Sequence, residues 1–147
     1  MFARMSQKEE IMTIIGHPAI AYPPFIKVSS LQEIAHTQAA QILWFDPMQC
    51  DKDTGYTLAN HCCKYQVPYA VRVNNITDLL IYANLQAKYL IVHFEDSLQD
   101  AMQYQKIIEH YLLDCKLLYP IKNDAQIQKV AKCGIDGVIF KQVLGNI

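Results

Sequence analysis

Residues 69–92 read YAVRVNNITDLLIYANLQAKYLIV, and this stretch decides the fold. An apolar run rich in β-branched and aromatic residues ends at Asn75, a helical pattern follows, and a second apolar run occupies residues 89–92. Asn75 and Asp78 have the spacing of a helix capping pair, in which a side-chain oxygen accepts an amide of the first turn. Because two parallel neighbouring strands need a crossover between them, this order predicts a βαβ unit.

The same arrangement recurs on both sides of this unit. Residues 25–30 (FIKVSS) return at 42–45 (ILWF), and residues 117–123 (LLYPIKN) return at 137–140 (GVIF). The other capping pairs are Ser30 with Glu33, Ser97 with Asp100, and Asn123 with Gln126. The pattern predicts an α/β fold with about six mainly parallel strands and five crossover helices. A flavodoxin-like open sheet, an incomplete (βα) barrel and an incomplete barrel completed by a second copy all agree with it.

The 147 residues suit one domain. Helices are expected at residues 31–40, 56–66, 76–86, 98–113 and 125–133. Residues 1–24 form a lead-in, with a short helix over residues 6–15 that Ser6 caps and Gly16 ends, followed by a proline-rich approach to the first strand. Residues 25–147 then carry the βα repeats.

Composition limits the partners. Hydrophobic residues make up 52% of the chain and charged residues 18%, and 13 basic against 14 acidic residues leave a net charge of −1. This balance argues against nucleic acid and against an anionic membrane surface as partners. The apolar stretch 12–26 is interrupted by glycine and proline, which argues against a membrane helix.

The five cysteines have no CxxC or zinc-finger spacing, so we expect reduced thiols in a soluble, cytoplasmic protein without a metal or cofactor.

Charged residues interrupt strands that should be apolar when they are buried on both faces. Lys27, Arg72 and His93 lie within or directly after apolar runs. The two-residue period of a strand places the following residues on one face, near the carboxyl ends: Lys27 and Ser29, Arg72 and Asn74, His93 and Glu95, Lys122, and Lys141. Ligands bind at this end in barrels and in open α/β sheets.

We therefore expect a site for a small anionic metabolite, phosphorylated or carboxylate. Its ligand-binding residues would be Lys27, Asp46, Arg72, Asn74 and Lys122. His93 and Glu95 would supply acid–base chemistry of the lyase or isomerase kind. Strand ends also emerge into solvent, where polar residues are expected without any ligand. No glycine-rich phosphate loop or nucleophile motif is present, so catalysis stays open, and a non-catalytic interaction or regulatory module is the alternative.

Residues 122–140 (KNDAQIQKVAKCGIDGVIF) resemble the late βα segments of TIM-barrel enzymes, in which a capped helix ends at glycine and a strand begins with Asp-Gly. The resemblance implies a barrel-like fold. It includes no family-specific catalytic motif and so assigns no residue role. Six strands are also fewer than the eight of that barrel.

Such a sheet would leave uncovered edges, which natural proteins pair or protect. The terminal run 137–140, continued by Val143 and Leu144, carries little charge. We expect a homodimer through this strand or through the helix at residues 6–15. The alternative is a monomer in which that helix folds back over the exposed surface.

Overall fold

The computed structural model describes residues 11–94 and 96–145, which form one α/β half-barrel. Seven parallel strands make a single sheet in the order β1-β7-β6-β5-β4-β3-β2. The strands are β1 (Thr13–Ile15), β2 (Phe25–Lys27), β3 (Ile42–Phe45), β4 (Tyr69–Val73), β5 (Tyr89–Val92), β6 (Lys116–Ile121) and β7 (Gly137–Phe140). The helices are α2 (Leu31–Ile34), α3 (Lys52–Tyr65), α4 (Ile76–Asn84), α5 (Leu98–His110) and α6 (Ile127–Lys132), with 3-10 turns η1 (Asp124–Gln126) and η2 (Lys141–Leu144).

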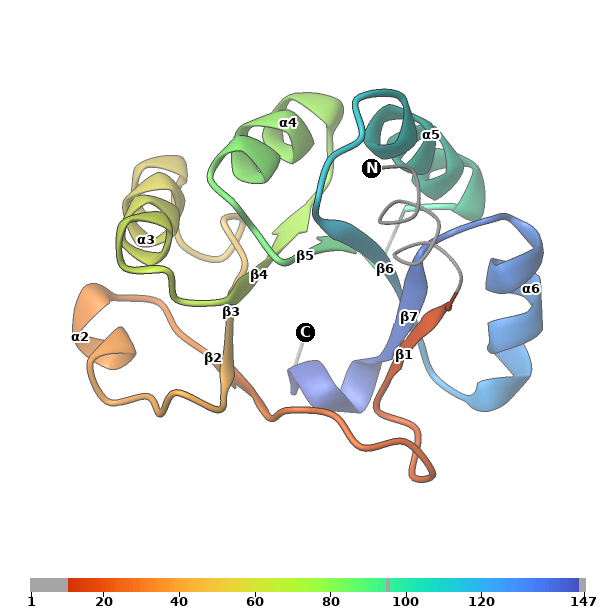
Figure 1. The fold of residues 1–147 in the computed structure, drawn as a ribbon, viewed down its shortest axis with the longest axis horizontal. Helices are drawn as coiled ribbons and strands as arrows, with labels where there is room; N and C mark the ends of the chain where they lie inside the picture. The colour runs from red at the N-terminus through yellow and green to blue at the C-terminus, as the bar shows by residue number, and fades with distance from the viewer. Residues whose placement is uncertain (1–10, 95, 146–147) are drawn as a thin grey trace, which may run out of the picture.

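The sheet curls but does not close (Figure 1). Helices α2 to α6 follow one another around its outer face, and the opening lies between β1 and β2. The segment 16–24 runs along the opening, and η2 lies beside it. The prediction of an α/β fold with a parallel sheet and five crossover helices is confirmed, and the curled open sheet is a half-barrel, which corresponds to the incomplete barrel among the alternatives.

The helix predicted over residues 6–15 is wrong at its carboxyl-terminal end. Residues 6–10 lie outside the described part, but Thr13–Ile15 form strand β1, which pairs with β7. Three consecutive β-branched residues favour a strand over a helix. This strand raises the number from the predicted six to seven. It also means that β7 is not an edge, because β7 lies between β1 and β6.

Two predicted helix boundaries shifted for local reasons. Helix α2 spans only Leu31–Ile34 instead of residues 31–40. The Thr37 hydroxyl donates to the carbonyl of Ile34 at 2.7 Å. This side chain therefore provides a hydrogen-bond donor for the last carbonyl of the helix. Helix α3 begins at Lys52, before the predicted residue 56, because Asp51 caps it by accepting the amide of Thr54 at 2.7 Å.

The predicted capping residues lie where the strands meet the helices. Ser97 with Asp100 and Asn123 with Gln126 form reciprocal capping boxes. Asn75 accepts the amide of Asp78 at 2.8 Å, and Ser30 accepts that of Glu33 at 3.2 Å. In return, the Glu33 carboxylate accepts a hydrogen bond from the amide of Ser29 rather than from that of Ser30. This hydrogen bond lowers the pKa of the Glu33 carboxyl group.

The sheet separates two hydrophobic clusters. The larger outer cluster packs the outward strand residues, such as Tyr69 and Leu90, against helix residues such as Leu79 and Tyr82. The smaller inner cluster fills the concave side and consists of Ile15, Phe25, Ile42, Trp44, Ala70, Ile91, Leu118, Ile139 and Leu144. Leu144 comes from η2, so the end of the described chain helps to fill the opening.

Glycine allows β1 to approach β7. A side chain at Gly137 would place its Cβ 2.4 Å from the carbonyl oxygen of Thr13 and 2.9 Å from Leu118 Cδ2. Any residue with a Cβ would push the strands apart. The edge of the half-barrel therefore depends on this glycine.

Candidate functional site at the carboxyl ends of the strands

A buried ion pair lies at the centre of the concave side. Asp46 and Arg72 directly follow the register partners Phe45 and Val71, so they leave neighbouring strands at the same height. Arg72 Nε lies 3.3 Å from Asp46 Oδ2, and each side chain is 3% exposed. The other carboxylate oxygen, Oδ1, accepts the amide of Met48 at 3.0 Å. The sequence predicted both residues for the ligand site, Arg72 from strand alternation and Asp46 as a carboxylate that follows a strand.

The guanidinium of Arg72 has unused donors. Its Nε and Nη2 atoms are buried and have no hydrogen-bond partner, because the contact with Asp46 lacks hydrogen-bond geometry. Burial lowers the pKa of Arg72, and the charge of Asp46 opposes that shift. A buried charged donor without a partner is costly, so an additional acceptor would stabilise it.

Two aromatic rings flank this guanidinium. Arg72 Cζ lies 6.0 Å from the centroid of Trp44 and 5.6 Å from that of Phe94, within the range of cation–π attraction. Trp44 is buried on β3, whereas Phe94 follows β5 and is 41% exposed. The rings hold the cation from two sides, and Phe94 also forms part of the outer surface.

Lysine side chains lie beside the two aromatic rings that contact Arg72. Lys27 Nζ lies 5.2 Å from the Trp44 centroid and donates a hydrogen bond to Gln49 Oε1. Lys141 Nζ lies 5.3 Å from the Phe94 centroid. The pKa of Lys141 is lowered, first by partial burial and then by the positive charges of Lys122 and Arg72. Lys122, Lys141 and Arg72 therefore form one cationic cluster at the carboxyl ends of β4, β6 and β7.

The remaining predicted residues lie around this cluster or outside the described chain. His93 follows β5, and its ring stacks on that of Phe94 with 4.9 Å between centroids. Asn74 Nδ2 contacts Met48 Sδ at 3.0 Å, and its carbonyl oxygen accepts from Asn75, so this amide is engaged within the loops. Glu95 lies outside the described residues.

Sequence reasoning missed the aromatic part of the site. Neither Trp44 nor Phe94 was among the predicted site residues. A signal was present for Trp44, which is the register partner of Lys27 and shares the alternation set of Asp46. Phe94 falls outside the inward alternation set and curves toward Arg72 after the strand has ended, which the sequence pattern does not reveal.

A hollow of about 220 Å³ opens beside the ion pair. It is lined by Lys27, Val28, Ser29, Asp46, Gln49 and Cys50. Most drug-sized ligands occupy hollows of about 300–1,000 Å³, so this one suits a small molecule. Burial is the main cause that raises the pKa of the Cys50 thiol, which therefore stays protonated.

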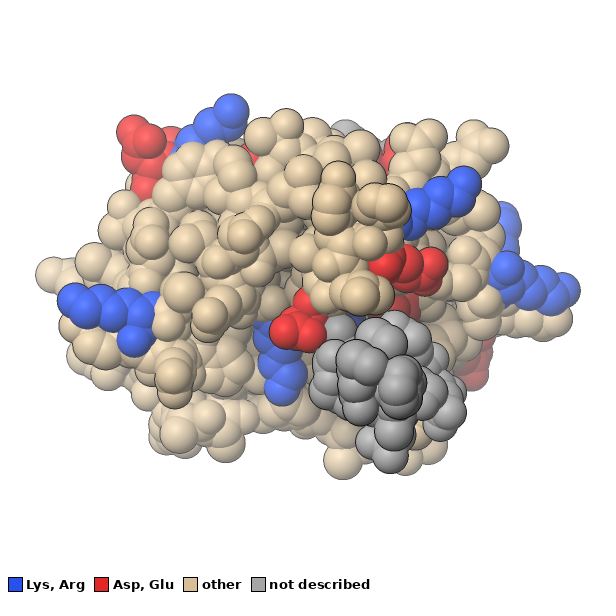
Figure 2. Space-filling model, turned by 45° about the horizontal axis from the view of Figure 1, so that its top comes forward, with Lys and Arg blue, Asp and Glu red and all other residues tan. Residues whose placement is uncertain are grey.

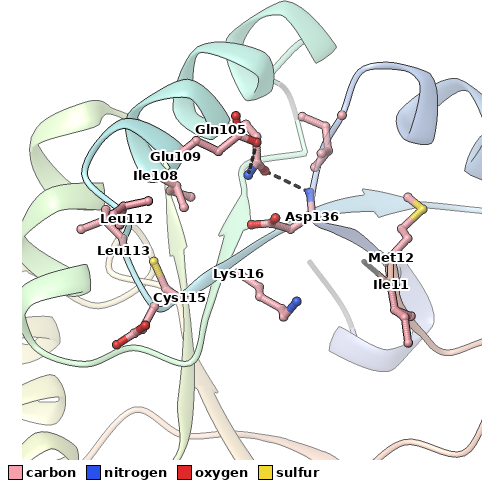
Figure 3. A pocket seen from close by; sticks show the side chains of 13 residues that line it. Ile11, Met12, Gln105, Ile108, Glu109, Leu112, Leu113, Cys115, Lys116 and Asp136 are labelled. Atoms are coloured by element: carbon pink, nitrogen blue, oxygen red, sulfur yellow. Dashed lines mark hydrogen bonds between the residues drawn. The ribbon is translucent and has the colours of Figure 1, made fainter. Parts of the chain in front are cut away.

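A larger hollow of about 600 Å³ lies at the opposite end, beside the amino-terminal ends of β6 and β7 (Figure 3). Its buried polar groups are used in the fold: Gln105 Oε1 accepts the amide of Asp136 at 3.0 Å, and Asp136 Oδ2 accepts the amide of Leu117 at 3.0 Å. The lining also includes the acidic residues Glu109 and Asp114. Together with Asp136 these carboxylates outnumber the one lysine of the lining, Lys116, so the smaller hollow is the better candidate for the predicted anionic ligand.

Charged side chains are scattered over the face drawn in Figure 2, and those of the described residues do not gather there into a basic patch. No three His, Cys, Asp or Glu side chains in the described part of the chain lie close enough together to hold a metal ion. None of the helices that the structure describes has the length and apolar character needed to cross a membrane.

The fold and the site together define an α/β half-barrel with a cationic cluster at the carboxyl ends of its strands. Neither the protein-family models nor the curated proteins compared with the chain give a match. Function is therefore argued from the site itself.

Proposed function

We propose that the protein binds a small anionic metabolite, phosphorylated or carboxylate, at the carboxyl ends of its strands. The observation that carries this proposal is the cationic cluster of Arg72, Lys122 and Lys141, which within the described chain has only Asp46 as a paired carboxylate. Like charges held close together cost free energy, and a bound anion would relieve that cost. The unused Nη2 donor of Arg72 adds a hydrogen-bond site.

The lysines are the better test residues for this proposal. Arg72 is buried beside Asp46, so its replacement would disturb the fold and the site at once. Lys122 is exposed and Lys141 half-buried, so their replacement mainly removes charge. Lys27 and Gln49, which line the small hollow, would contact the far side of the ligand.

Acid–base chemistry of the lyase or isomerase kind is part of this proposal. His93 follows β5 and stacks on Phe94, whose ring centroid lies 5.6 Å from Arg72 Cζ, and its imidazole would be the first acid–base group. Glu95 would be the second acid–base group. A keto acid or a sugar phosphate has both the negative charge and the acidic C–H bonds that such residues would use.

A thermal-shift screen of phosphorylated sugars, nucleotides and keto acids tests the binding. A ligand at about one hundred times its dissociation constant should add about 2.7 kcal/mol of stability. The Lys122→Met/Lys141→Met variant should lose this response, whereas Lys129→Met, which removes an exposed lysine of α6, should keep it. No response across all three classes of compound would contradict the proposal.

The second candidate is a non-catalytic interaction module. Met48 is 60% exposed and Phe94 41% exposed at the same end of the sheet, and exposed apolar side chains beside charges are common in protein interfaces. A Met48→Ser/Phe94→Ser variant that keeps its response to anions but loses a protein partner would favour this function.

We also propose a cytoplasmic protein that forms a homodimer. All five cysteines are free thiols, which suits a reducing compartment. The outer edges of β1 and β2 are the ones available for pairing, since β1 covers β7. Light scattering at rising micromolar concentrations tests the dimer: a mass that stays near 16.9 kDa would contradict it.

A further inference from the structure

Lys141 occupies a special position in the cationic cluster. Ile121 of β6 and Phe140 of β7 are register partners, and Lys122 and Lys141 directly follow them. The two lysines thus leave neighbouring parallel strands at the same height. Neighbouring strands lie about 4.8 Å apart, so the lysine backbones are close enough for both amines to reach one small molecule.

The surroundings of Lys141 favour a neutral amine. No carboxylate of the described residues lies within ion-pair distance of its Nζ atom, and the positive charges of Lys122 and Arg72 act on it. Its residue is partly buried, which disfavours the charged form, whereas the ring of Phe94, 5.3 Å from Nζ, attracts the ammonium and opposes that effect. Desolvation and neighbouring positive charge both shift a lysine toward its unprotonated form, which is the nucleophile.

The other lysines near the site have different surroundings. Lys27 Nζ donates to Gln49 Oε1, which holds the amine in a hydrogen bond. Lys122 is exposed, so water solvates its ammonium group. Of these three lysines, Lys141 is therefore the one whose surroundings least favour the charged form, and Lys122 and Arg72 are the positive charges that act on it.

We propose that Lys141 forms a Schiff base with a 2-oxo carboxylic acid whose carboxylate is held by Lys122 and Arg72. The inference rests on the proposed anion site. In a 2-oxo acid the carboxylate is bonded directly to the carbonyl carbon, which fits two amines on adjacent strands. A phosphorylated aldehyde places its charge farther from the carbonyl and fits this spacing less well.

The chemical step needs these groups and one proton from the solvent. The unprotonated Nζ attacks the carbonyl carbon, the carbonyl oxygen takes up a proton, and nitrogen loses one to give a neutral carbinolamine. A second proton then reaches the hydroxyl group, water leaves, and a C=N bond forms with nitrogen carrying one hydrogen and a positive charge. This cation draws electrons from the neighbouring C–H or C–C bond, which is the activation that lyase chemistry requires.

Reductive trapping tests the proposal. The full chain is incubated with pyruvate and cyanoborohydride at neutral pH, and peptide mass spectrometry follows the alkylation of each lysine with time. Lys141 should be modified at least about tenfold faster than Lys129, because binding positions the carbonyl next to its amine. Lys141→Arg keeps the charge and should abolish the fast modification.

Acetaldehyde in place of pyruvate provides the matched control for the carboxylate. Lys122→Met should slow the modification of Lys141 by pyruvate much more than that by acetaldehyde, which has no charge to be held. Equal slowing with both reagents would overturn the assignment of Lys122 as the carboxylate partner.

Thermal-shift measurements on the same samples separate this inference from the proposed function. Stabilisation by pyruvate without preferential modification of Lys141 would overturn the Schiff base and leave the anion site standing. Absence of both with pyruvate would overturn the Schiff base, and the anion site would also be overturned if phosphorylated sugars, nucleotides and the other keto acids gave no stabilisation. Preferential modification together with stabilisation would support both.

Discussion

The two faces of the sheet differ in what they bury. The outer face is apolar along the whole length of the strands, and its polar groups are mainly tyrosine hydroxyls and Gln105. Arg72 interrupts the inner face at the height of Ile91 and Leu118, and the buried Asp46 lies beside it at the same height. Lys122 and Lys141 lie farther along, at the carboxyl ends of β6 and β7.

The apolar outer face stabilises the fold, whereas the charged residues of the inner face are buried at a cost in folding free energy. A buried ion pair is often no more stabilising than apolar side chains of the same volume, so stability alone does not explain Asp46 and Arg72. Positions that break the local packing rule are where function is expected. The difference between the faces is therefore a physical reason to look for the site on the inner face.

Breaking the buried ion pair should have the largest effect on stability. Arg72→Met leaves the Asp46 carboxylate buried without its partner and should lower the free energy of unfolding by about 3–5 kcal/mol in urea denaturation. The double variant Asp46→Leu/Arg72→Met should recover most of this loss, because no buried charge remains. Lys129→Met, on the exposed side of α6, should change stability by about 0.5 kcal/mol or less.

An unchanged unfolding midpoint in Arg72→Met would mean that water or another group solvates Asp46. The inner face would then be an open, wet site rather than a packed one. That result would reduce the contrast between the two faces and make Arg72 a direct ligand without a structural role.

Adding a side chain where β1 and β7 lie close together should have the next largest effect on stability. Gly137→Ala places a Cβ 2.4 Å from the Thr13 carbonyl oxygen and should cost about 1–3 kcal/mol through overpacking. At Gly134 a new Cβ would have no heavy atom within 4 Å, and the cost of Gly134→Ala comes only from its positive φ of 74°. That cost is about 1 kcal/mol. Equal losses in the two variants would contradict the close approach of the strands.

Removing tyrosine hydroxyls on the outer face should change stability less, and the sign of the change should depend on whether the hydroxyl has a hydrogen-bond partner. The Tyr69 hydroxyl donates to the Leu85 carbonyl at 2.9 Å, so Tyr69→Phe should cost about 1 kcal/mol. The Tyr82 hydroxyl is buried without a partner, so Tyr82→Phe should be neutral or stabilising. Thermal unfolding of the two variants under identical conditions makes the comparison. A loss in Tyr82→Phe as large as that in Tyr69→Phe would show that Tyr82 has an acceptor in solution.

Most of the fold could be predicted from the sequence because its signals are local. Capping residues such as Asn75 and Ser97, and apolar runs such as residues 89–92, act within a few residues of one another. The strand β1 was missed because it has only three residues, and its partner β7 is more than one hundred residues away. Pairing over such a distance leaves no periodic signal in a short run.

The site could be predicted only in part for a related reason. Alternation placed Lys27 and Arg72 on one face, and Asp46 was added because it follows a strand; the register of the sheet puts Asp46 level with Arg72. It could not show that Arg72 pairs with Asp46 rather than facing water, because burial depends on the curl of the whole sheet. Phe94 was missed because it lies after the strand, where the two-residue period no longer applies.

Neutralising Lys141 should have the smallest effect on stability and a defined dependence on pH. Its pKa is lowered in the folded chain, so between that pKa and the unfolded value near 10.4 the unfolded chain binds more protons than the folded one. Stability of the wild-type protein due to this group therefore rises with pH across that window. Lys141→Met lacks this dependence.

Relative to wild type, Lys141→Met should therefore be slightly more stable at pH 7, by about 0.5 kcal/mol or less, and this advantage should shrink as the pH approaches 10. Lys129→Met, measured over the same pH range, subtracts the general effect of replacing a lysine by methionine, and ionisation of the tyrosines cancels between variants. Added salt should also reduce the advantage, because it screens the repulsion from Lys122. A Lys141→Met variant that is less stable than wild type at pH 7, after this correction, would mean that attractive contacts of the Lys141 ammonium outweigh its desolvation and its repulsion from the neighbouring charges. The cationic end of the inner face would then be stabilised by the fold itself, and repulsion among its charges would no longer point to a missing anion.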